Sequence, residues 1–308
     1  MIEIQKNIPL KKHSTFQIGG PAKYFTIVKN TSQLVESLEW AKQNNLPFFL
    51  LGGGSNILFS DKGYEGLIIK IQISDIKVKG DKVFCEAGTP LSKILNITAR
   101  EGLSGLEWTA GIPGTIGGAI FGNAGAFGLG IKNILESVKV LNLKSFQIED
   151  FKSEDCQFSY RSSIFKKRKN YVILKVELKL QRRAKEDIHK RIEENFLYRR
   201  ERHPLKYPSV GSIFKNVKLT KENLKLTEKF PDFKQFLQKG EIPAAYLIHC
   251  CDLKGKKIGG AQISKKHPNF IININNAKAE DVIILISVIK QKVRNQFGIQ
   301  LEEEIIIM

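Results

Sequence analysis

The consecutive glycines of Leu51–Asn56, which reads LGGGSN, are the first residues in the chain whose type and spacing suggest chemistry. They follow the apolar run Phe48–Leu51, which is typical of a buried strand. Glycines at such a point can direct successive backbone N–H groups toward an anion, typically a pyrophosphate. The spacing matches neither a Rossmann fingerprint nor a Walker loop, because no Lys-Ser or Lys-Thr pair follows the glycines. Alone, the segment is also typical of a flexible turn.

A second glycine-rich segment, Gly111–Gly125, reads GIPGTIGGAIFGNAG. A long dinucleotide needs close backbone approach at its pyrophosphate and again near its ring system, and glycine allows this because it lacks a Cβ. The two segments together therefore predict a dinucleotide site. The surrounding run Ala110–Ile131 carries no charge, but its glycines and Pro113 disfavour a membrane helix. We interpret it as a glycine-rich loop and predict no membrane insertion.

Hydrophobic periodicity predicts the elements that hold these segments. The predicted strands are Tyr24–Val28, Phe48–Leu51, Val83–Ala87, Ser137–Leu143, Val172–Leu180 and Glu304–Met308. The predicted helices are Ser32–Asn44, Asp187–Arg202 and Ala279–Phe297. The last helix carries an apolar stripe, Val282, Leu285, Ile286, Ile289, Val293 and Phe297, and is expected to end at Gly298. Residues 71–180 are therefore expected to be dominated by sheet.

The composition is that of a folded protein, with 308 residues of which 42% are hydrophobic and 26% charged. This chain is longer than one hydrophobic core usually organises, so two or three lobes are expected. The net charge of +18 raises the question of nucleic-acid binding. However, the basic residues are spread along the chain without interleaved aromatic residues, so we predict no nucleic-acid partner. A lysine-rich surface also attracts anionic ligands.

Neither the cysteines nor the histidines form a metal-ligand pattern, so no metal site is predicted. The cysteines, which we interpret as reduced core residues, are Cys85, Cys156, Cys250 and Cys251. The first residues lack an apolar run of the length found in signal peptides, so a cytoplasmic location is expected.

Taken in order, eight short segments resemble the UDP-N-acetylenolpyruvoylglucosamine reductases over nearly the whole chain. They are Ser14–Ala22 (STFQIGGPA), Leu51–Leu58 (LGGGSNIL), Gly111–Ala119 (GIPGTIGGA), Tyr160–Ser163 (YRSS), Gly211–Asn216 (GSIFKN), Leu253–Gly255 (LKG), Ile258–Ala261 (IGGA) and Leu301–Glu304 (LEEE). Each segment is a weak signal, but their joint order is specific to the family. The chain departs from the family pattern at Val217, where proline is usual, and at Met308, where a glycine-containing tail is common.

The resemblance implies an α+β fold. It implies a two-lobed FAD-binding domain of the PCMH or vanillyl-alcohol-oxidase type, followed by a C-terminal α+β substrate-binding domain. The expected flavin lobes are residues 1–70, joined by the C-terminal strand 299–308, and residues 71–205. The expected substrate domain is residues 206–298. The chain is similar to the shorter branch of the family, which lacks an extra substrate-closing loop, and a monomer is favoured.

The implied activity is the reduction of UDP-N-acetylenolpyruvoylglucosamine to UDP-N-acetylmuramate in peptidoglycan precursor synthesis. NADPH is the implied hydride donor, and hydride is expected to pass from flavin N5 to C3 of the enol ether before a proton adds at C2. Hydride addition drives negative charge into the adjacent carboxylate, so the site needs a cation or hydrogen-bond donors there and an acid for C2. FAD is expected to be bound non-covalently, because neither glycine segment contains a histidine.

The resemblance assigns roles to individual residues. Arg161 matches the catalytic arginine and is expected to hold the substrate carboxylate through its planar fork. Ser212 matches the acid that protonates C2. Glu304 matches a C-terminal glutamate that donates a hydrogen bond or moves a proton, although the neighbouring Glu302 and Glu303 leave the register open. The expected substrate-binding residues are Lys215, Asn216 and His267. The expected cofactor-binding residues are Gly52, Gly53, Gly54, Ser55, Asn56, Gly114, Thr115, Gly117, Gly118, Ala119 and Asn123.

Structural interpretations of the same residues stay open: a surface ion pair for Arg161, a turn for Ser212 and a structural histidine for His267. Two other functions also stay open. One is another oxidoreductase on the same flavin scaffold, such as an alcohol or amine oxidase, and the other is a basic RNA-binding protein. A visible spectrum would separate the flavoproteins from the RNA-binding protein, and oxygen consumption would separate an oxidase from the reductase.

Overall fold

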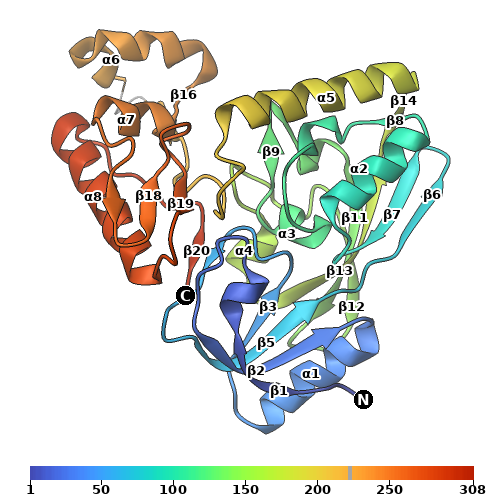
Figure 1. The fold of residues 1–308 in the computed structure, drawn as a ribbon. Coiled ribbons are helices and arrows are strands. Elements are labelled where there is room, and N and C mark those ends of the chain that lie inside the picture. The colour runs from blue at the N-terminus through green and yellow to red at the C-terminus, as the bar shows by residue number, and fades with distance from the viewer. Residues whose placement is uncertain (221–223) are drawn as a thin grey trace. The chain divides into compact units, whose positions relative to one another are not determined.

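The computed structural model describes residues 1–220 and 224–308, and this part of the chain forms two compact units (Figure 1). Unit 1 combines Met1–Ile8, Ala22–Gly54 and Glu65–Glu201. Unit 2 combines Pro9–Pro21, Ser55–Tyr64 and Arg202–Met308. The division into two flavin lobes and a substrate domain stays a prediction.

Two sheets organise unit 1. The first sheet has the strand order β1-β2-β5-β3, with β3 parallel to β5. Its strands are β1 (Gln5–Pro9), β2 (Pro21–Val28), β3 (Phe48–Leu51) and β5 (Tyr64–Ile71). The second sheet is antiparallel, in the order β12-β11-β13-β7-β6. Its strands are β6 (Ile76–Lys79), β7 (Lys82–Glu86), β11 (Leu135–Asn142), β12 (Ile148–Lys152) and β13 (Tyr171–Lys179).

Helix α1 (Thr31–Gln43) covers one side of the first sheet. It begins at Asn30, whose Oδ1 accepts a hydrogen bond from the Gln33 N–H and so satisfies one of the free donors of the first turn. Its buried residues Leu34, Leu38 and Ala41 share a hydrophobic core with residues of both sheets. This core holds the two sheets of unit 1 together.

A second core in unit 1 lies between the five-stranded sheet and the helices α2 (Leu91–Arg100) and α3 (Ile116–Phe121). Strand β13 contributes to both cores, with Leu174 in the first and Ile173 in the second. The other elements of unit 1 are β8 (Leu103–Ser104), β9 (Gly125–Ala126), β10 (Leu129–Gly130), α4 (Ile164–Lys167), β14 (Gln181–Arg182) and α5 (Lys185–Arg202).

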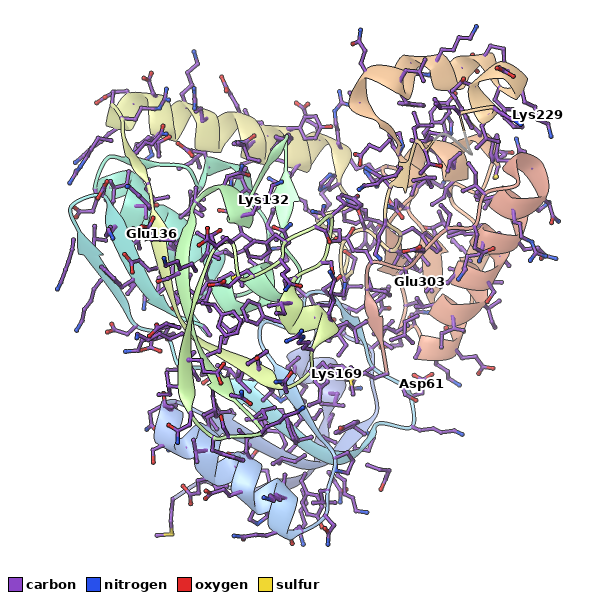
Figure 2. The ribbon with its side chains drawn as sticks, turned by 180° about the vertical axis from the view of Figure 1, so that it is seen from behind. Asp61, Lys132, Glu136, Lys169, Lys229 and Glu303 are labelled. Atoms are coloured by element: carbon purple, nitrogen blue, oxygen red, sulfur yellow. The ribbon has the colours of Figure 1, made fainter. Side chains whose placement is uncertain are left out.

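Unit 2 is built around helix α8 (Ala279–Phe297). Every residue of its predicted apolar stripe is buried, and Gly298 ends it in the left-handed conformation with φ 72°. At the other end, the Asp61 carboxylate accepts hydrogen bonds from the N–H groups of Ala279 and Glu280 (Asp61 is labelled in Figure 2). A carboxylate is favourable there because it satisfies free N–H groups and opposes the helix dipole.

The remaining elements of unit 2 are short. The strands are β4 (Ile57–Leu58), β15 (Val217–Lys218), β16 (Glu241–Ile242), β17 (Lys257–Ile258), β18 (Ala261–Ile263), β19 (Ile271–Asn273) and β20 (Ile306–Ile307). The helices are α6 (Leu226–Lys229) and α7 (Ala244–Cys250), with a 3-10 segment at Pro231–Lys239. Strands β17, β18 and β19 form an antiparallel sheet, and β20 pairs with β4 in parallel. None of the helices in the described residues has the length and apolar content that crossing a membrane requires.

Residues 71–180 are dominated by sheet as predicted, because strands β6 to β13 contribute more residues there than helices α2, α3 and α4. Three other predictions were wrong. Helix α3 lies inside the segment predicted as a glycine-rich loop. The predicted strand Glu304–Met308 is shortened to Ile306–Ile307, because only these residues pair with β4. Cys250 is exposed and Cys251 is half-buried, so the core interpretation holds only for Cys85 and Cys156. Cys250 is the last residue of α7 and Cys251 is its C-cap, so the pair lies at the end of this helix, where only Cys251 packs against the core.

Candidate functional site

The two glycine-rich segments lie against one another in unit 1. A Cβ added to Gly52 would lie 2.8 Å from the Thr115 Oγ1, and one added to Gly53 would lie 2.7 Å from the Gly114 Cα. Real side chains do not tolerate such distances, so the contact requires glycine on the first segment. Gly54 has φ 65°, which also favours glycine. The structure therefore brings together the two segments that the sequence predicts to share one ligand.

The second segment is a short helix at its centre. Thr115 is the N-cap of α3, and its Oγ1 accepts a hydrogen bond from the Gly118 N–H. The space beside Gly117 is filled by Ala87. The Gly117 N–H donates to the Ala87 carbonyl, and a Cβ added to Gly117 would lie 2.9 Å from the Ala87 Cβ. Gly118 is exposed and faces open space, with Thr115 Oγ1 the nearest atom at 3.6 Å. Of these two adjacent glycines, only Gly118 leaves room for a ligand.

Arg161 lies at the tip of a tight turn in unit 1. Ser159 and Ser162 exchange two backbone hydrogen bonds across the turn, at 3.0 and 3.1 Å. Arg161 has φ 54°, a left-handed conformation that is uncommon for a residue other than glycine. Lys166 Nζ donates a hydrogen bond to the Arg161 carbonyl at 3.3 Å. The turn is thus held in a strained form that presents one arginine.

The backbone segments that carry Ser212 and Glu304 are hydrogen-bonded to each other in unit 2, at Ile213. Ser212 forms a β-bridge with Phe270, and the Ile213 N–H donates to the Asn269 carbonyl at 2.8 Å. On the other side, the Glu304 N–H donates to the Ile213 carbonyl at 2.8 Å. The segment that carries Ser212 is therefore the middle one of three.

Asn56, predicted to bind the cofactor, lies at the Glu304 segment. Its Nδ2 donates to the Glu304 carbonyl at 3.3 Å, and its own carbonyl accepts from the Ile306 N–H. Both Ser55 and Asn56 belong to unit 2, whereas the glycines before them and Arg161 belong to unit 1.

The two glutamates that precede Glu304 in the sequence each form an ion pair with a lysine. Glu302 forms an ion pair with Lys215, with 3.0 Å between Nζ and Oε2, and Glu303 forms one with Lys290 at 2.8 Å. Glu303 is labelled in Figure 2. Of these two pairs, that of Glu303 is partly buried, whereas the Glu302 side chain is exposed.

Asn216 is held by its own surroundings. Its Nδ2 donates to the Glu241 carboxylate at 2.8 Å, and its Oδ1 accepts from the Ala244 N–H at the start of α7. These bonds tie the GSIFKN segment to α7.

His267 lies in an aromatic group with His203 and Phe270, at ring-centroid distances of 5.2 and 4.8 Å. Its Nδ1 is buried and has no hydrogen-bond partner among the described residues. Burial lowers the pKa of His267 to about 4. The imidazole is therefore neutral near pH 7.

The low pKa of His267 predicts a contribution to acid unfolding. An unfolded histidine has a pKa of about 6.5, so between about pH 6.5 and about pH 4 the unfolded chain binds more protons at this residue. Stability should therefore fall as the pH falls through that window. The unfolding free energy should be measured by denaturant titration at several pH values across this window. His267→Gln should reduce the slope of that free energy against pH by up to the contribution of about one bound proton. His189→Gln, at an exposed histidine of α5, should leave the slope unchanged. An identical pH dependence in His267→Gln and the unsubstituted chain would contradict this account.

Sequence reasoning missed Asn269 and Arg199. Asn269 is 3% exposed, and its amide bonds both backbone groups of Phe214, which holds the Ser212 segment in place. Arg199 is 4% exposed and donates to the Ala110 carbonyl at 2.6 Å, just before the second glycine segment. The sequence gives no sign that these two polar side chains are buried, because their burial depends on tertiary packing. Among the described residues, no cluster of His, Cys, Asp or Glu is suited to a metal ion.

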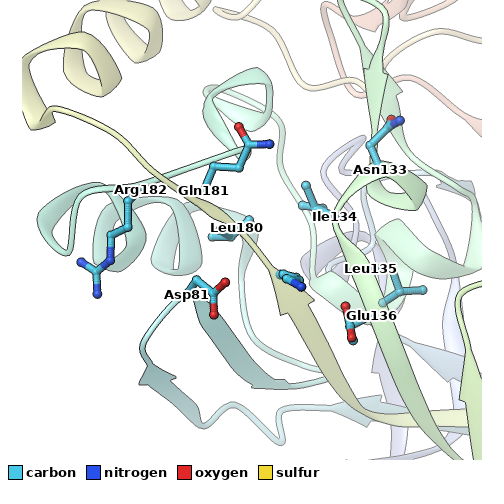
Figure 3. Close-up of a pocket in the computed structure, with 9 residues that line it drawn as sticks. Asp81, Asn133, Ile134, Leu135, Glu136, Leu180, Gln181 and Arg182 are labelled. Carbon is cyan, nitrogen blue, oxygen red and sulfur yellow. The ribbon is translucent and has the colours of Figure 1, made fainter.

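The pocket in Figure 3 also lies in unit 1, but it is lined by other residues than the two glycine segments. Its described lining residues are Asp81, Asn133, Ile134, Leu135, Glu136, Lys179, Leu180, Gln181 and Arg182, and none is a predicted site residue. The Arg182 guanidinium is bonded to the carbonyls of Glu101 and Gly80. We assign this pocket no role.

Comparisons with known proteins match both parts of the chain. Residues 22–145 match the FAD binding domain family, and residues 203–308 match the C-terminal domain of UDP-N-acetylenolpyruvoylglucosamine reductase. A UDP-N-acetylenolpyruvoylglucosamine reductase of Caldanaerobacter subterraneus subsp. tengcongensis is 38% identical over 303 residues, 98% of this chain and 92% of the relative. One of Clostridium kluyveri is 37% identical over 308 residues, 99% of this chain and 93% of the relative.

The crystal structure of UDP-N-acetylenolpyruvylglucosamine reductase from Thermus caldophilus superposes with a TM-score of 0.78 at 31% identity. The match covers 100% of this chain and 98% of the other. A FAD-binding domain joined to a reductase C-terminal domain defines this chain as a flavin-dependent oxidoreductase. The chain belongs to the UDP-N-acetylenolpyruvoylglucosamine reductase family. The family, the α+β fold class and the FAD cofactor predicted from the motifs are confirmed.

Proposed function

We propose that the chain reduces UDP-N-acetylenolpyruvoylglucosamine to UDP-N-acetylmuramate with NADPH, in peptidoglycan precursor synthesis. The observation that carries this proposal is the 38% identity to a named reductase over 98% of the chain. The meeting of the Ser212 and Glu304 segments across Ile213 supports it, because the same two segments carried the resemblance in the sequence.

The paired glycine segments fit a bound FAD. Backbone at Gly52 and Gly53 packs on Gly114 and Thr115 with no space for a side chain, while the neighbouring Gly118 faces open space. We propose that these segments, with Gly54, Ser55, Asn56 and Ala119, hold FAD without a covalent bond. When bound, FAD supplies hydride transfer from NADPH to C3 of the enol ether.

We propose that three side chains serve the reacting atoms. Arg161 holds the substrate carboxylate where negative charge develops, and its strained turn supports this role because strain of this kind is typical of functional sites. Ser212 donates the proton to C2. Glu304 assists as a hydrogen-bond donor or proton carrier, and its backbone hydrogen bond to Ile213, the residue after Ser212, supports this role.

We also propose that Lys215, His267 and Asn216 contact the substrate, and their present hydrogen-bond and ion-pair partners differ. Lys215 is suited to a phosphate, because its present partner Glu302 is exposed and easily exchanged. His267 offers a neutral imidazole whose Nδ1 has no hydrogen-bond partner within residues 1–220 and 224–308. Asn216 would have to exchange the bonds to Glu241 and Ala244 before it could bind substrate.

The organisation of the enzyme is also proposed. The flavin lobes are residues 1–70 with strand 299–308 and residues 71–205, and the substrate domain is residues 206–298. We propose a cytoplasmic monomer.

Two adjacent glycines provide a matched test of the cofactor site. Gly118→Val should weaken FAD affinity by about 10-fold or more while changing unfolding little, because its side chain enters open space that the cofactor needs. Gly117→Ala should instead destabilise the fold by about 1–3 kcal/mol, since its Cβ would collide with Ala87. FAD titration and denaturant unfolding of both variants separate the two effects. Normal FAD affinity in a folded Gly118→Val variant would remove Gly118 from the cofactor site.

A steady-state assay tests the proposed function. The purified protein should be yellow, should release its flavin into the supernatant on acid precipitation, and should oxidise NADPH only when the UDP-enolpyruvyl sugar is present. Rapid oxygen consumption without that sugar would indicate a flavin oxidase instead. A colourless protein that copurifies with RNA would support the nucleic-acid alternative.

A further inference from the structure

Asn123 occupies a backbone position that few residue types accept. It follows α3 with φ 46°, and its N–H donates to the Ile120 carbonyl. Asparagine, aspartate and glycine tolerate this left-handed conformation best. The backbone therefore explains the choice among three residue types, and the side chain must explain why asparagine is present.

The two ends of the Asn123 amide have different surroundings. Its Nδ2 donates to the Ser159 carbonyl at 2.8 Å. Its Oδ1 is buried and has no hydrogen-bond partner among the described residues, in a side chain that is 8% exposed. The opposite amide orientation would place two acceptors together at Ser159, so the assignment is fixed by chemistry. A buried acceptor without a donor is costly, which indicates that a ligand supplies one.

The Ser159 carbonyl belongs to the turn that presents Arg161. The same turn has a second tie to α3, because Ser163 Oγ donates to the Phe121 carbonyl at 2.8 Å. Ser159 and Ser163 stand on either side of Arg161, so both ends of the turn are fastened to the C-terminal end of α3. Helix α3 contains Gly117 and Gly118 of the second glycine segment.

We propose that Asn123 is a positioning residue that couples cofactor binding to the placement of Arg161. One end of its amide holds the Arg161 turn, and the other accepts a hydrogen bond from bound FAD. This inference rests on the proposed function, since it assigns Arg161 to the substrate carboxylate. It adds a structural connection between the cofactor segment and the catalytic arginine.

Two substitutions at Asn123 separate the two ends of the amide. Asn123→Asp keeps the left-handed conformation and the acceptor but removes the donor to Ser159. In the FAD-loaded protein, amide hydrogen exchange at Ser159 and Ser162 should become about 5- to 30-fold faster, with FAD affinity retained within about 2-fold. Its kcat should fall by about 10-fold or more, because a displaced arginine no longer meets the developing charge. Asn123→Gly removes both ends, so it should also weaken FAD binding.

Asn45→Asp is the matched control, because Asn45 has φ 50° in unit 1 but is exposed. It should change none of these quantities. Ser163→Ala offers an independent variant should Asn123→Asp not fold. It removes the second tie and should accelerate exchange in the turn with FAD affinity unchanged.

Several results would overturn the inference. Unchanged exchange at Ser159 and Ser162 in Asn123→Asp would show that the amide does not hold the turn. If that variant is unfolded, unchanged exchange in Asn123→Gly, which also lacks the donor to Ser159, would show the same. Equal FAD affinity in Asn123→Gly and the unsubstituted chain would remove the cofactor contact. Exchange and FAD affinity need no turnover, so a chain that fails to reduce the enolpyruvyl sugar would refute the proposed function and leave this measurement interpretable.

Discussion

Replacing Ser212 with alanine should leave reduction of the flavin by NADPH intact and slow its reoxidation by the enolpyruvyl sugar by about 10² to 10⁴. The first half-reaction involves no substrate carbon, so it does not need the proton for C2. The second half-reaction loses its general acid. Stopped-flow absorbance should show normal bleaching of the flavin band and very slow recovery.

Ser209→Ala is the matched control for Ser212→Ala, because Ser209 lies in the same segment and it is the Ser209 backbone carbonyl that accepts a hydrogen bond from Thr15 Oγ1. Recovery in this control should match the unsubstituted chain. If Ser212→Ala also recovers at the normal rate, Ser212 is a turn residue, and the proton must come from Glu304 or from water.

Arg161→Lys should lower kcat by about 10² even though the charge is kept. Lysine is a point charge and cannot reproduce the planar, two-point hold of a guanidinium on a carboxylate. The backbone conformation adds nothing to this difference, because neither side chain relieves the strain at φ 54°. Steady-state kinetics and FAD content should be measured together, since FAD content is expected to be normal.

Arg168→Lys is the control for Arg161→Lys, because Arg168 is an exposed arginine just after α4. It should change neither kcat nor KM. Unchanged kcat and KM in Arg161→Lys itself would return Arg161 to the surface ion-pair interpretation.

The elements with strong periodicity were predictable from the sequence. Helix α8 begins and ends where its apolar stripe and Gly298 predicted, because amphipathic spacing and a C-cap glycine are local signals. Helix α3 was not predictable in the same way. Its glycines have low helix propensity, and it forms because Thr115 caps it and because Ile116, Ala119 and Ile120 are buried in the core. Tertiary packing there overrides the local preference.

The candidate site was predictable as a set of segments, but not in its internal contacts. The sequence predicted that the two glycine segments serve one ligand, and the structure brings Gly53 against Gly114. It could not predict that Gly117 packs on Ala87 whereas its neighbour Gly118 faces open space. The bonds of Asn269 to Phe214 and of Asn123 to Ser159 were equally invisible, because they join residues that only the fold brings together.

A single turnover without oxygen tests the central claim most directly. The protein should be reduced with one equivalent of NADPH and then mixed with UDP-N-acetylenolpyruvoylglucosamine in deuterated water. The flavin absorption should recover, and the product should be UDP-N-acetylmuramate that carries solvent deuterium at C2. A flavin that stays reduced until oxygen is admitted, with the sugar unchanged, would contradict the account.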